Sequence, residues 1–384
     1  MGTIGIGMAG HAFMGAVHAH AWRTAPRVFD TRLTPVLAAL AGRDGVRTAA
    51  AAAKYGFAAA ETDWGALVAR DDVGLVDVCT PGDTHAAIAI AALEAGKHVL
   101  CEKPLANTVE EAEKMAGAAR AAAARGVRAM VAFNYRRVPA LAHAARLVAD
   151  GALGEVRHVR ANYLQDWLSD PAAPMTWRLR RDRAGSGALG DLGAHLVDAV
   201  QFVTGERITR VSAATTTFVH TRPDGNGGRG EVTVDDCALF TARLSGGAVA
   251  AFEATRYALG RKNAMRLEIN GSRASMAFDF ESMNELWWFD GEAPATEAGF
   301  RRILVTEPGH PYLAGWWPPG HGLGYDHTFT HEVADLLTAI AEGADPLPGF
   351  DEGLRVQRVL HAVEASAADE ARWTTVPDDE ETAR

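Results

Sequence analysis

The chain has 384 residues, more than one hydrophobic core ordinarily serves, so two domains are expected. Hydrophobic residues make up 48% and charged residues 22%, the balance of a soluble globular protein. The net charge is −10 and no run of Lys and Arg occurs. These features argue against nucleic acid and against an anionic membrane as partners, because phosphate groups are bound by basic patches.

The cysteines point to a reducing compartment. Cys79, Cys101 and Cys237 form neither a CxxC pair nor an even framework, so we expect no structural zinc, no iron–sulfur cluster and no other metal. The N-terminus lacks the basic region of a signal peptide, and no apolar stretch of about 18 residues is free of charge. A cytoplasmic location is therefore expected.

The first third of the chain alternates short apolar runs with longer helical segments. Runs bounded by Gly, Pro or Asp predict buried strands at 3–9, 34–41, 74–80, 97–101 and 127–132. The Ala-rich segments between them predict helices at 14–25, 45–55, 84–95 and 108–125. This alternation predicts an α/β domain with a doubly wound parallel sheet and helices on both faces.

From about residue 155 the pattern changes to alternating apolar and polar residues, typical of strands with one solvated face. Such strands are expected at 155–164, 208–218, 235–244, 247–256, 264–270 and 285–289. Short glycine-containing turns join several of them, which favours a second domain rich in antiparallel strands. Further helices are expected at 190–204 and 351–370, and loops at 222–230 and 306–326.

Two overlapping glycine patterns lie near the N-terminus. Gly5-x-Gly7-x-x-Gly10 matches the dinucleotide-binding fingerprint literally, but only four residues of strand precede it. The offset pattern Gly10-His11-Ala12-Phe13-Met14-Gly15 leaves residues 4–9 for the strand and begins the helix near Met14. A pyrophosphate needs the turn after the strand, so we expect it at Gly10, Ala12, Phe13 and Met14. A glycine-rich strand without a ligand is the alternative.

The end of the second strand should contact the adenosine ribose. An acidic residue there favours NAD, whereas Arg favours the 2′-phosphate of NADP. The sequence reads Gly42-Arg43-Asp44, with glycine at the usual acidic position. Arg43 can pair with a phosphate or stack on adenine, and Asp44 can hold the ribose or cap the next helix. This segment leaves the choice of cofactor open.

Three further segments complete a characteristic set of motifs. They are Val76-Asp77-Val78-Cys79-Thr80-Pro81 with His85, then Cys101-Glu102-Lys103-Pro104, and the run GALGDLGAH that ends at His195. With the first glycine turn, this set resembles the Gfo/Idh/MocA oxidoreductases over nearly the whole chain. The run from Tyr163 to Leu168, with Trp177-Arg178, resembles the levoglucosan-dehydrogenase-like branch.

The resemblance implies a Rossmann domain at 1–135 and an α/β domain with a large mixed, mostly antiparallel sheet at 136–350. The second domain would hold the substrate and make the contacts of a homodimer or homotetramer, while the last helix and tail, 351–384, would pack back on the first domain. The resemblance also implies that Thr80, Pro81 and His85 line the nicotinamide side and that Glu102-Lys103 carries the catalytic lysine. It favours NAD(H), with NADP(H) as the alternative.

The chemistry expected of these residues is hydride transfer. Oxidation of a secondary alcohol needs a group that takes the hydroxyl proton. Asp191 and His195 are spaced i and i+4 on a predicted helix and share a face. His195 suits a base, and Lys103 can stabilise a developing alkoxide. Which of Lys103 and His195 is the formal base stays open, and an unrelated helix carboxylate and histidine are the alternative reading of the pair.

Aromatic and charged residues in the second half are candidates for contact with a sugar-like substrate. They are Tyr135, Arg136, Tyr163, Asp166, Trp177, Arg178 and His327. Asp166 and Arg178 fit a structural ion pair nearly as well. The aromatic loop from Tyr312 to Tyr325 fits a lid and a subunit interface equally. His18 and His20 are expected to be packing or surface residues.

These features predict an NAD(P)-dependent dehydrogenase of a sugar, an anhydrosugar or a cyclitol. An NAD-dependent glycosidase that oxidises its substrate transiently is one alternative, and no feature of the sequence separates the two. A dinucleotide-sensing regulator on the same fold is the other alternative. Lys103, Asp191 and His195 argue against it, because a sensor needs none of them.

Overall fold

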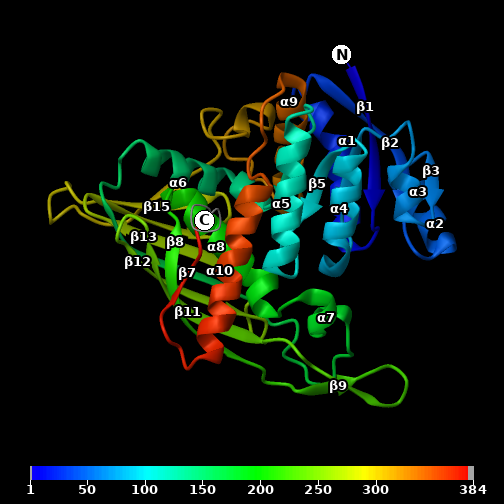
Figure 1. Cartoon of the computed structure of the whole chain (residues 1–384). Helices are drawn as coiled ribbons and strands as arrows, with labels where there is room; N and C mark the ends of the chain where they lie inside the picture. The colour runs from blue at the N-terminus through cyan, green and yellow to red at the C-terminus, as the bar shows by residue number, and fades with distance from the viewer. Residues whose placement is uncertain (1, 379–384) are drawn as a thin grey trace. The chain divides into compact units, whose positions relative to one another are not determined.

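The computed structural model describes residues 2–378 and divides the chain into two compact units (Figure 1). Unit 1 contains the chain up to Asn134 together with Gly324–Leu354, and unit 2 contains Tyr135–Leu323 and the chain from Arg355 onward. The second domain was expected to run from 136 to 350. In the structure the segment Gly324–Leu354 belongs to unit 1 instead. The last residues of the expected C-terminal tail, 379–384, lie outside the described part.

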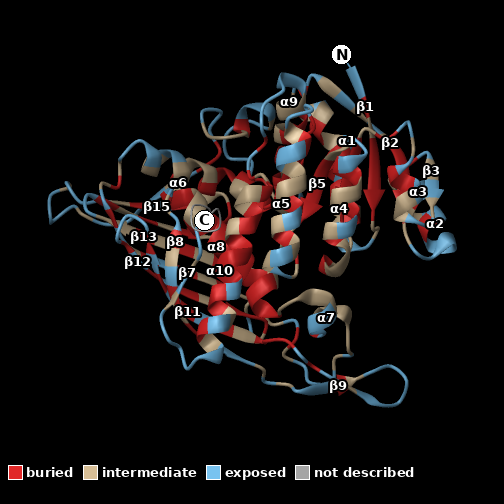
Figure 2. Ribbon diagram, viewed as in Figure 1, coloured by how far each residue is buried: buried red, intermediate tan, exposed pale blue. Residues whose placement is uncertain are grey.

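Unit 1 is built on a six-stranded parallel sheet in the order β3-β2-β1-β4-β5-β6. The strands are β1 (Gly2–Ala9), β2 (Leu33–Ala41), β3 (Ala59–Glu61), β4 (Leu75–Val78), β5 (His98–Glu102) and β6 (Ala129–Ala132). All residues of β4 and β6 are buried, and Figure 2 shows most of β1 and β5 coloured as buried. Burial on both faces is the reason these strands read as continuous apolar runs.

Five of the helices described in unit 1 connect these strands, and a sixth comes from a later segment of the chain. They are α1 (Phe13–Val28), α2 (Gly45–Tyr55), α3 (Trp64–Val68), α4 (His85–Glu94), α5 (Val109–Ala123) and α9 (Tyr325–Glu342). Helix α9 was not expected. It packs on α1, and Phe329 and Val333 share a buried cluster with Trp22. That apolar cluster ties the segment from Gly324 to unit 1.

Unit 2 contains a nine-stranded mixed sheet in the order β16-β15-β14-β13-β7-β12-β11-β8-β17, in which only the β7–β12 pair is parallel. Its strands are β7 (Val156–Leu164), β8 (Ile208–Thr216), β11 (Cys237–Leu244), β12 (Val249–Thr255), β13 (Ala264–Gly271), β14 (Ala274–Asp279), β15 (Glu285–Asp290), β16 (Arg301–Leu304) and β17 (Thr374–Thr375). The predicted mixed, mostly antiparallel sheet is confirmed.

Helices cover one face of this sheet. They include α6 (Pro139–Ala149), which contacts β14 and β15, and α8 (Ala194–Thr204), which contacts β7. The remaining elements are the short α7 (Arg181–Ala184), the turn η3 (Trp177–Leu179) and α10 (Phe350–Ala368), which runs from unit 1 into unit 2. Along β11, Ala238, Phe240 and Ala242 are buried while the residues between them are exposed. The other face of the sheet is therefore open within the unit.

Two expected loops contain regular structure. Residues 222–230 form part of a small hairpin of β9 (Thr221–Pro223) and β10 (Arg229–Glu231). The segment 306–326 contains one 3₁₀ turn, η6 (Leu313–Gly315), and reaches the start of α9. Across residues 2–378, the helices are too short or too polar to cross a lipid bilayer.

Candidate functional site

The turn after β1 has the geometry of the offset glycine pattern. Strand β1 ends at Ala9 and helix α1 begins at Phe13, with Gly10 in the turn at a φ of +98°. A Cβ on Gly10 would lie 2.6 Å from the carbonyl oxygen of Cys79, and one on Gly15 would lie 2.4 Å from that of Gly10. Both positions therefore require glycine. Ala12 at the helix start offers no capping side chain to the amides of the first turn, and such amides are the groups that bind phosphate at a helix N-terminus.

The literal pattern has a packing explanation instead. Gly5 and Gly7 lie inside β1. A Cβ on Gly5 would lie 1.7 Å from the Asp72 carbonyl oxygen, and one on Gly7 would lie 2.9 Å from the Val73 side chain. Glycine at these two positions lets the segment before β4 approach the strand closely, and it makes no ligand-binding turn.

The end of β2 explains the glycine at the usual acidic position. A Cβ on Gly42 would lie 2.6 Å from His11 Nε2, which is itself 3.3 Å from the Thr48 hydroxyl. The His11 imidazole thus occupies the space beside Gly42. Asp44 caps α2 by accepting a hydrogen bond from the Arg47 amide at 3.1 Å. Of the two roles considered for Asp44, the structure shows the cap.

The segment after β4 is fixed to the segment after β5 by one histidine. His85 is buried, and its ring nitrogens lie 2.9 Å from the Thr80 carbonyl oxygen and 3.1 Å from the Pro104 carbonyl oxygen. The Thr84 hydroxyl donates to the Thr80 hydroxyl at 2.7 Å and to the Pro81 carbonyl. The structure therefore brings Thr80, Pro81 and His85 together with Pro104, which follows Lys103.

The residue before Lys103 belongs to a buried charge cluster. Glu102 accepts hydrogen bonds from His18 at 2.9 Å and from the Lys103 amide at 3.1 Å, and His18 also lies 3.0 Å from Asp77. His18 is only 1% exposed. The prediction that His18 is an ordinary packing or surface residue was wrong, because it is a buried partner of two carboxylates. His20 is the surface residue expected, with a side chain that is 57% exposed.

In unit 2, Asp191 lies in a π-helical turn. The turn η4 (Leu189–Gly193) precedes α8, so the predicted single helix at 190–204 begins with a wider turn. The Asp235 carboxylate accepts hydrogen bonds from the amides of Gly187 and Leu189 at 2.6 and 2.8 Å and anchors this turn. The guanidinium of the buried Arg256 lies 3.9 Å from the Asp191 carboxylate. Arg256 thereby places a positive charge beside Asp191.

His195 lies among aromatic side chains. Its ring stacks on Tyr135 with 4.4 Å between ring centroids, and the Tyr163 ring is 6.0 Å away. The Tyr135 hydroxyl lies 2.5 Å from the Tyr163 hydroxyl, which donates to Asn263 at 2.7 Å. Gln165 also donates to Asn263, at 2.7 Å. These five side chains form a polar and aromatic cluster of the kind that binds hydroxylated ligands.

Burial changes the acidity of Tyr135. Desolvation raises the pKa of its phenol to about 12, although hydrogen bonds from Tyr163 and Asn263 act in the opposite direction. The negative charge of Asp191 also raises the pKa of Tyr135. The phenol therefore keeps its proton at neutral pH and serves as a neutral hydrogen-bonding group.

Other substrate candidates have structural partners. Arg136 pairs with Asp198 through three hydrogen bonds of 2.6–3.1 Å. Asp166 pairs with Lys262 at 2.7 Å, and the Arg178 guanidinium lies 4.6 Å from the centroid of the Trp177 ring. Each of these three side chains therefore has an interaction partner within unit 2.

His327 belongs to unit 1, not to the second domain where it was expected. Its Nδ1 accepts a hydrogen bond from the Gly324 amide at 3.0 Å at the start of α9. The structure thus shows a role for His327 in ending the loop and starting the helix.

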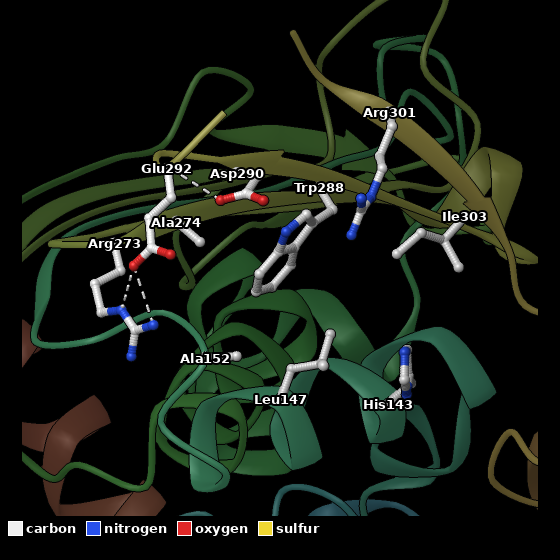
Figure 3. Close-up of a pocket in the computed structure, with 10 residues that line it drawn as sticks. All are labelled: His143, Leu147, Ala152, Arg273, Ala274, Trp288, Asp290, Glu292, Arg301 and Ile303. Atoms are coloured by element: carbon white, nitrogen blue, oxygen red, sulfur yellow. Dashed lines mark hydrogen bonds and ion pairs between the residues drawn. The ribbon is translucent and has the colours of Figure 1, made fainter. Parts of the chain in front are cut away.

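A hollow of about 410 Å³ lies elsewhere in unit 2, between α6 and strands β14–β16. Figure 3 shows the Trp288 indole pointing toward α6, with Arg301 and His143 to one side. The ion pair of Arg273 and Glu292, 3.2 Å long, lies on the other side. The hollow is lined by none of the sequence-predicted site residues, so it is distinct from the cluster around His195.

Sequence reasoning missed several residues of these clusters. His11, His18 and Asp77 belong to unit 1, and Gln165, Asp235, Arg256 and Asn263 belong to unit 2. The one usable signal was Asp77, a carboxylate in the middle of a fully apolar strand pattern, which requires a buried partner. Polar residues in the strands of unit 2 carried no comparable signal.

Together these features define a class of protein: a dinucleotide-binding oxidoreductase with a second, mixed-sheet domain. Two family models match the chain. The oxidoreductase family with an NAD-binding Rossmann fold matches residues 4–133, and the GFO/IDH/MocA C-terminal domain matches residues 141–277.

Individual proteins resemble the chain over almost its full length. Levoglucosan dehydrogenase of Pseudarthrobacter phenanthrenivorans is 39% identical and covers 98% of this chain and 99% of its own. The crystal structure of an oxidoreductase domain protein from Kribbella flavida is 64% identical, with a TM-score of 0.96, and covers 98% of this chain and 100% of its own. A levoglucosan dehydrogenase in complex with NADH and levoglucosan is 40% identical, with a TM-score of 0.94, and covers 98% and 99%. The chain belongs to the Gfo/Idh/MocA family of oxidoreductases.

The geometry of Gly10 leads to a binding prediction. Gly10→Ala should weaken NADH binding about tenfold or more, because a side chain at this φ costs about 1–2 kcal/mol and would press on Cys79. Gly117→Ala in α5, where a Cβ meets open space, is the matched control and should bind NADH as the wild type does. Titration of nicotinamide fluorescence measures both. Unchanged affinity in Gly10→Ala would show that the dinucleotide binds elsewhere.

Proposed function

We propose that this protein is an NAD-dependent dehydrogenase that oxidises a secondary hydroxyl of an anhydrosugar, a sugar or a cyclitol. The observation that carries the proposal is its likeness, over 98% of its length, to a levoglucosan dehydrogenase solved with NADH and levoglucosan. A second support is the cluster of hydroxyl, amide and imidazole groups around His195, because such groups recognise ligands rich in hydroxyls.

NAD would be held by the turn at Gly10, with Phe13 and Met14 at the helix start and Thr80, Pro81 and His85 near the nicotinamide. The close approach of the chain at Gly10 and the uncapped start of α1 fit a pyrophosphate there. When bound, the nicotinamide supplies the acceptor for the hydride. Glu102, through its contact with the Lys103 amide, belongs to the same lining.

We propose that three residues of this chain serve the reaction. His195, held against Tyr135 by stacking, takes or relays the hydroxyl proton. Asp191, with the Arg256 guanidinium 3.9 Å from its carboxylate, orients His195 or accepts a hydrogen bond from a neighbouring substrate hydroxyl. Lys103 supplies the positive charge that stabilises the developing alkoxide. Either Lys103 or His195 is the formal base.

NAD is the favoured cofactor over NADP. The related levoglucosan dehydrogenase structures hold NADH. In the segment after β2, the Arg47 guanidinium lies 3.5 Å from the Asp44 carboxylate and is paired with it. The other cation of this segment is the exposed Arg43. One exposed arginine with the Asp44 carboxylate beside it makes a poor site for a 2′-phosphate. No residue is assigned to a metal in this mechanism.

Substrate contacts are proposed for Tyr135 and Tyr163, whose hydroxyls join the Asn263 and Gln165 amides in one network. Trp167 extends the network by donating its indole N–H to Gln165 at 2.9 Å while its ring remains 43% exposed. An exposed indole beside polar groups suits the apolar C–H face of a sugar ring. Arg136, Asp166 and Arg178 act through their structural partners instead.

A panel of polyols, sugars and levoglucosan, run with NAD and with NADP, tests this function. We expect absorbance of reduced nicotinamide to appear with levoglucosan or a related sugar, with kcat/KM for NAD at least about tenfold above that for NADP. Lys103→Ala should abolish turnover while it still binds NADH. Lys114→Ala, on the surface helix α5, is the matched control and should turn over normally.

Three results would contradict the proposal. Inactivity on every member of the panel would refute a sugar dehydrogenase. Glycoside cleavage without net NADH formation would indicate the transient-oxidation glycosidase. NADH binding without turnover of any sugar would indicate a dinucleotide sensor.

We also propose that the protein is a cytoplasmic homodimer or homotetramer formed through the open face of the sheet in unit 2. Its three cysteines are free thiols, which suits a reducing compartment. Leu239, Val249, Trp287 and Leu304 lie on that face with 37–48% of their surface exposed. Apolar side chains spaced across an uncovered sheet face are typical of a subunit contact.

Sedimentation analysis tests the assembly. The wild type should sediment as a dimer or tetramer, and Trp287→Glu should shift it toward the monomer, because burying a carboxylate in a subunit contact is unfavourable. Val46→Glu on α2, at a residue 83% exposed, is the matched control and should leave the mass unchanged. A monomeric wild type, or a Trp287→Glu variant of unchanged mass, would contradict this proposal.

A further inference from the structure

A histidine in unit 1 lies between two buried carboxylates. His18 Nδ1 is 3.0 Å from both carboxylate oxygens of Asp77, and His18 Nε2 is 2.9 Å from Glu102 Oε1. His18, Asp77 and Glu102 are 1%, 0% and 5% exposed. With so little solvent contact, the three side chains must satisfy one another.

The geometry sets the charge of His18. An ionised carboxylate accepts hydrogen bonds and cannot donate, so each imidazole nitrogen that faces one must carry a proton. Asp77 also accepts hydrogen bonds from the Trp22 indole N–H at 2.7 Å and from the Cys79 thiol at 3.3 Å. Two anions with one cation between them leave His18 as an imidazolium.

The acidity of His18 agrees with this assignment. Burial is the largest single influence on the pKa of His18 and lowers it, but the charges and hydrogen bonds of Asp77 and Cys79 together outweigh burial and raise the pKa well above the ordinary 6.5. Because the folded-state pKa exceeds the unfolded one, the stability that this proton contributes is complete below the unfolded value. It is lost as the pH rises through the folded value.

The cluster continues to the backbone of the proposed catalytic lysine. Glu102 accepts a hydrogen bond from the His18 ring through Oε1 and one from the Lys103 amide, at 3.1 Å, through Oε2. One carboxylate thus links the buried imidazolium to the residue that carries the ammonium group. A change in the orientation or charge of Glu102 moves the backbone from which Lys103 extends.

We propose that His18 is a positioning residue of the reaction: its imidazolium, anchored by Asp77, orients the Glu102 carboxylate, which fixes the backbone of Lys103. The inference rests on the proposed function, in which Lys103 acts on the substrate. His18 itself is too deeply buried to touch a substrate. Its effect is therefore expected in kcat, with little change in the KM for the sugar.

A metal ion is the competing occupant of this cluster, because ligand atoms of His18, Asp77 and Cys79 lie within 4.8 Å of one another. Two contacts favour the proton. Burial raises the pKa of the Cys79 thiol, so its S–H group donates a hydrogen bond to Asp77 and offers no thiolate to a metal. His18 Nε2 faces Glu102, so both ring nitrogens already have carboxylate partners.

The first test replaces the histidine by a neutral side chain of similar length. His18→Gln should lower kcat about 10- to 100-fold, with the sugar KM and the NADH affinity within about threefold of wild type. His20→Gln, two residues along the same helix and exposed, is the matched control and should leave kcat unchanged. Rates are divided by the concentration of NADH-binding sites, so a loss of folded protein does not count as a loss of kcat.

A double variant separates positioning from packing. In Asp77→Asn/His18→Gln the surplus anion is gone, and the Gln amide can donate to Glu102. We expect the kcat of the double variant to be at least about fivefold higher than the kcat of His18→Gln. Losses that simply add, or a His18→Gln enzyme with wild-type kcat, would overturn the proposal.

Nitrogen-15 NMR of histidine-labelled wild-type protein tests the charge of His18 directly, and the His18→Gln variant serves only to assign its signal. The signal that disappears in His18→Gln should show both ring nitrogens protonated at about pH 7.5, and elemental analysis should find less than about 0.1 metal ion per chain. A neutral ring or stoichiometric metal would overturn the proposal. Lys103→Ala, assayed in parallel, tests the proposed function separately from the charge of His18. Wild-type activity in Lys103→Ala would refute the role of Lys103, whatever the NMR spectrum shows.

Discussion

The parallel alignment of β1, β4 and β5 is the constraint on which the rest of the site depends. Ala9 lies opposite Val78, and Val78 lies opposite Cys101, so the chain leaves all three strands at one edge of the sheet. Gly10 must lack a side chain there because the Cys79 carbonyl is its immediate neighbour. The glycine turn, the Thr80 segment and the Lys103 segment are therefore neighbours because of strand order, as expected at the carboxyl edge of an open α/β sheet.

The same alignment explains the buried charges of unit 1. Asp77 lies in β4 and Glu102 at the end of β5, while His18 comes from α1, which covers this part of the sheet. A helix that packs on the sheet with an ordinary apolar residue at position 18 would leave two carboxylates buried without a counter-charge. The imidazolium makes this packing compatible with acidic residues so close to Lys103.

Much of the first sheet was predictable because its signals are local. Apolar runs located β1, β2, β4, β5 and β6 within a few residues, and the length of strand before each glycine pattern identified the register at Gly10. Helix α9 was not predicted, although Phe329, Val333 and Leu337 have helical spacing; it follows directly on the segment 306–326, which was expected to be a loop. Helix α6 and strand β14 were not predicted either, and β16 is a short strand at the edge of the sheet, of the kind that pattern alone rarely separates from loops.

The clusters of unit 2 could not be predicted in the same way, because their members come from strands far apart in the sequence. Asn263 lies 100 residues after Tyr163, and their hydrogen bond depends on β13 pairing with β7. Arg256 is fully buried, although arginine is ordinarily exposed, and only the fold shows that it lies beside Asp191. The helical spacing and the family resemblance predicted roles for Asp191 and His195, whereas the residues that contact them come from the structure.

The central claim is that hydride passes from a sugar carbon to NAD on this protein. The most direct measurement uses levoglucosan deuterated at all its ring carbons, with unlabelled NAD, and analyses the reduced cofactor by mass spectrometry and proton NMR. If hydride passes directly from the sugar to NAD, the NADH formed carries one deuterium at C4 of the nicotinamide ring. NADH without deuterium, or deuterated sugar that is consumed with no NADH formed, would contradict it.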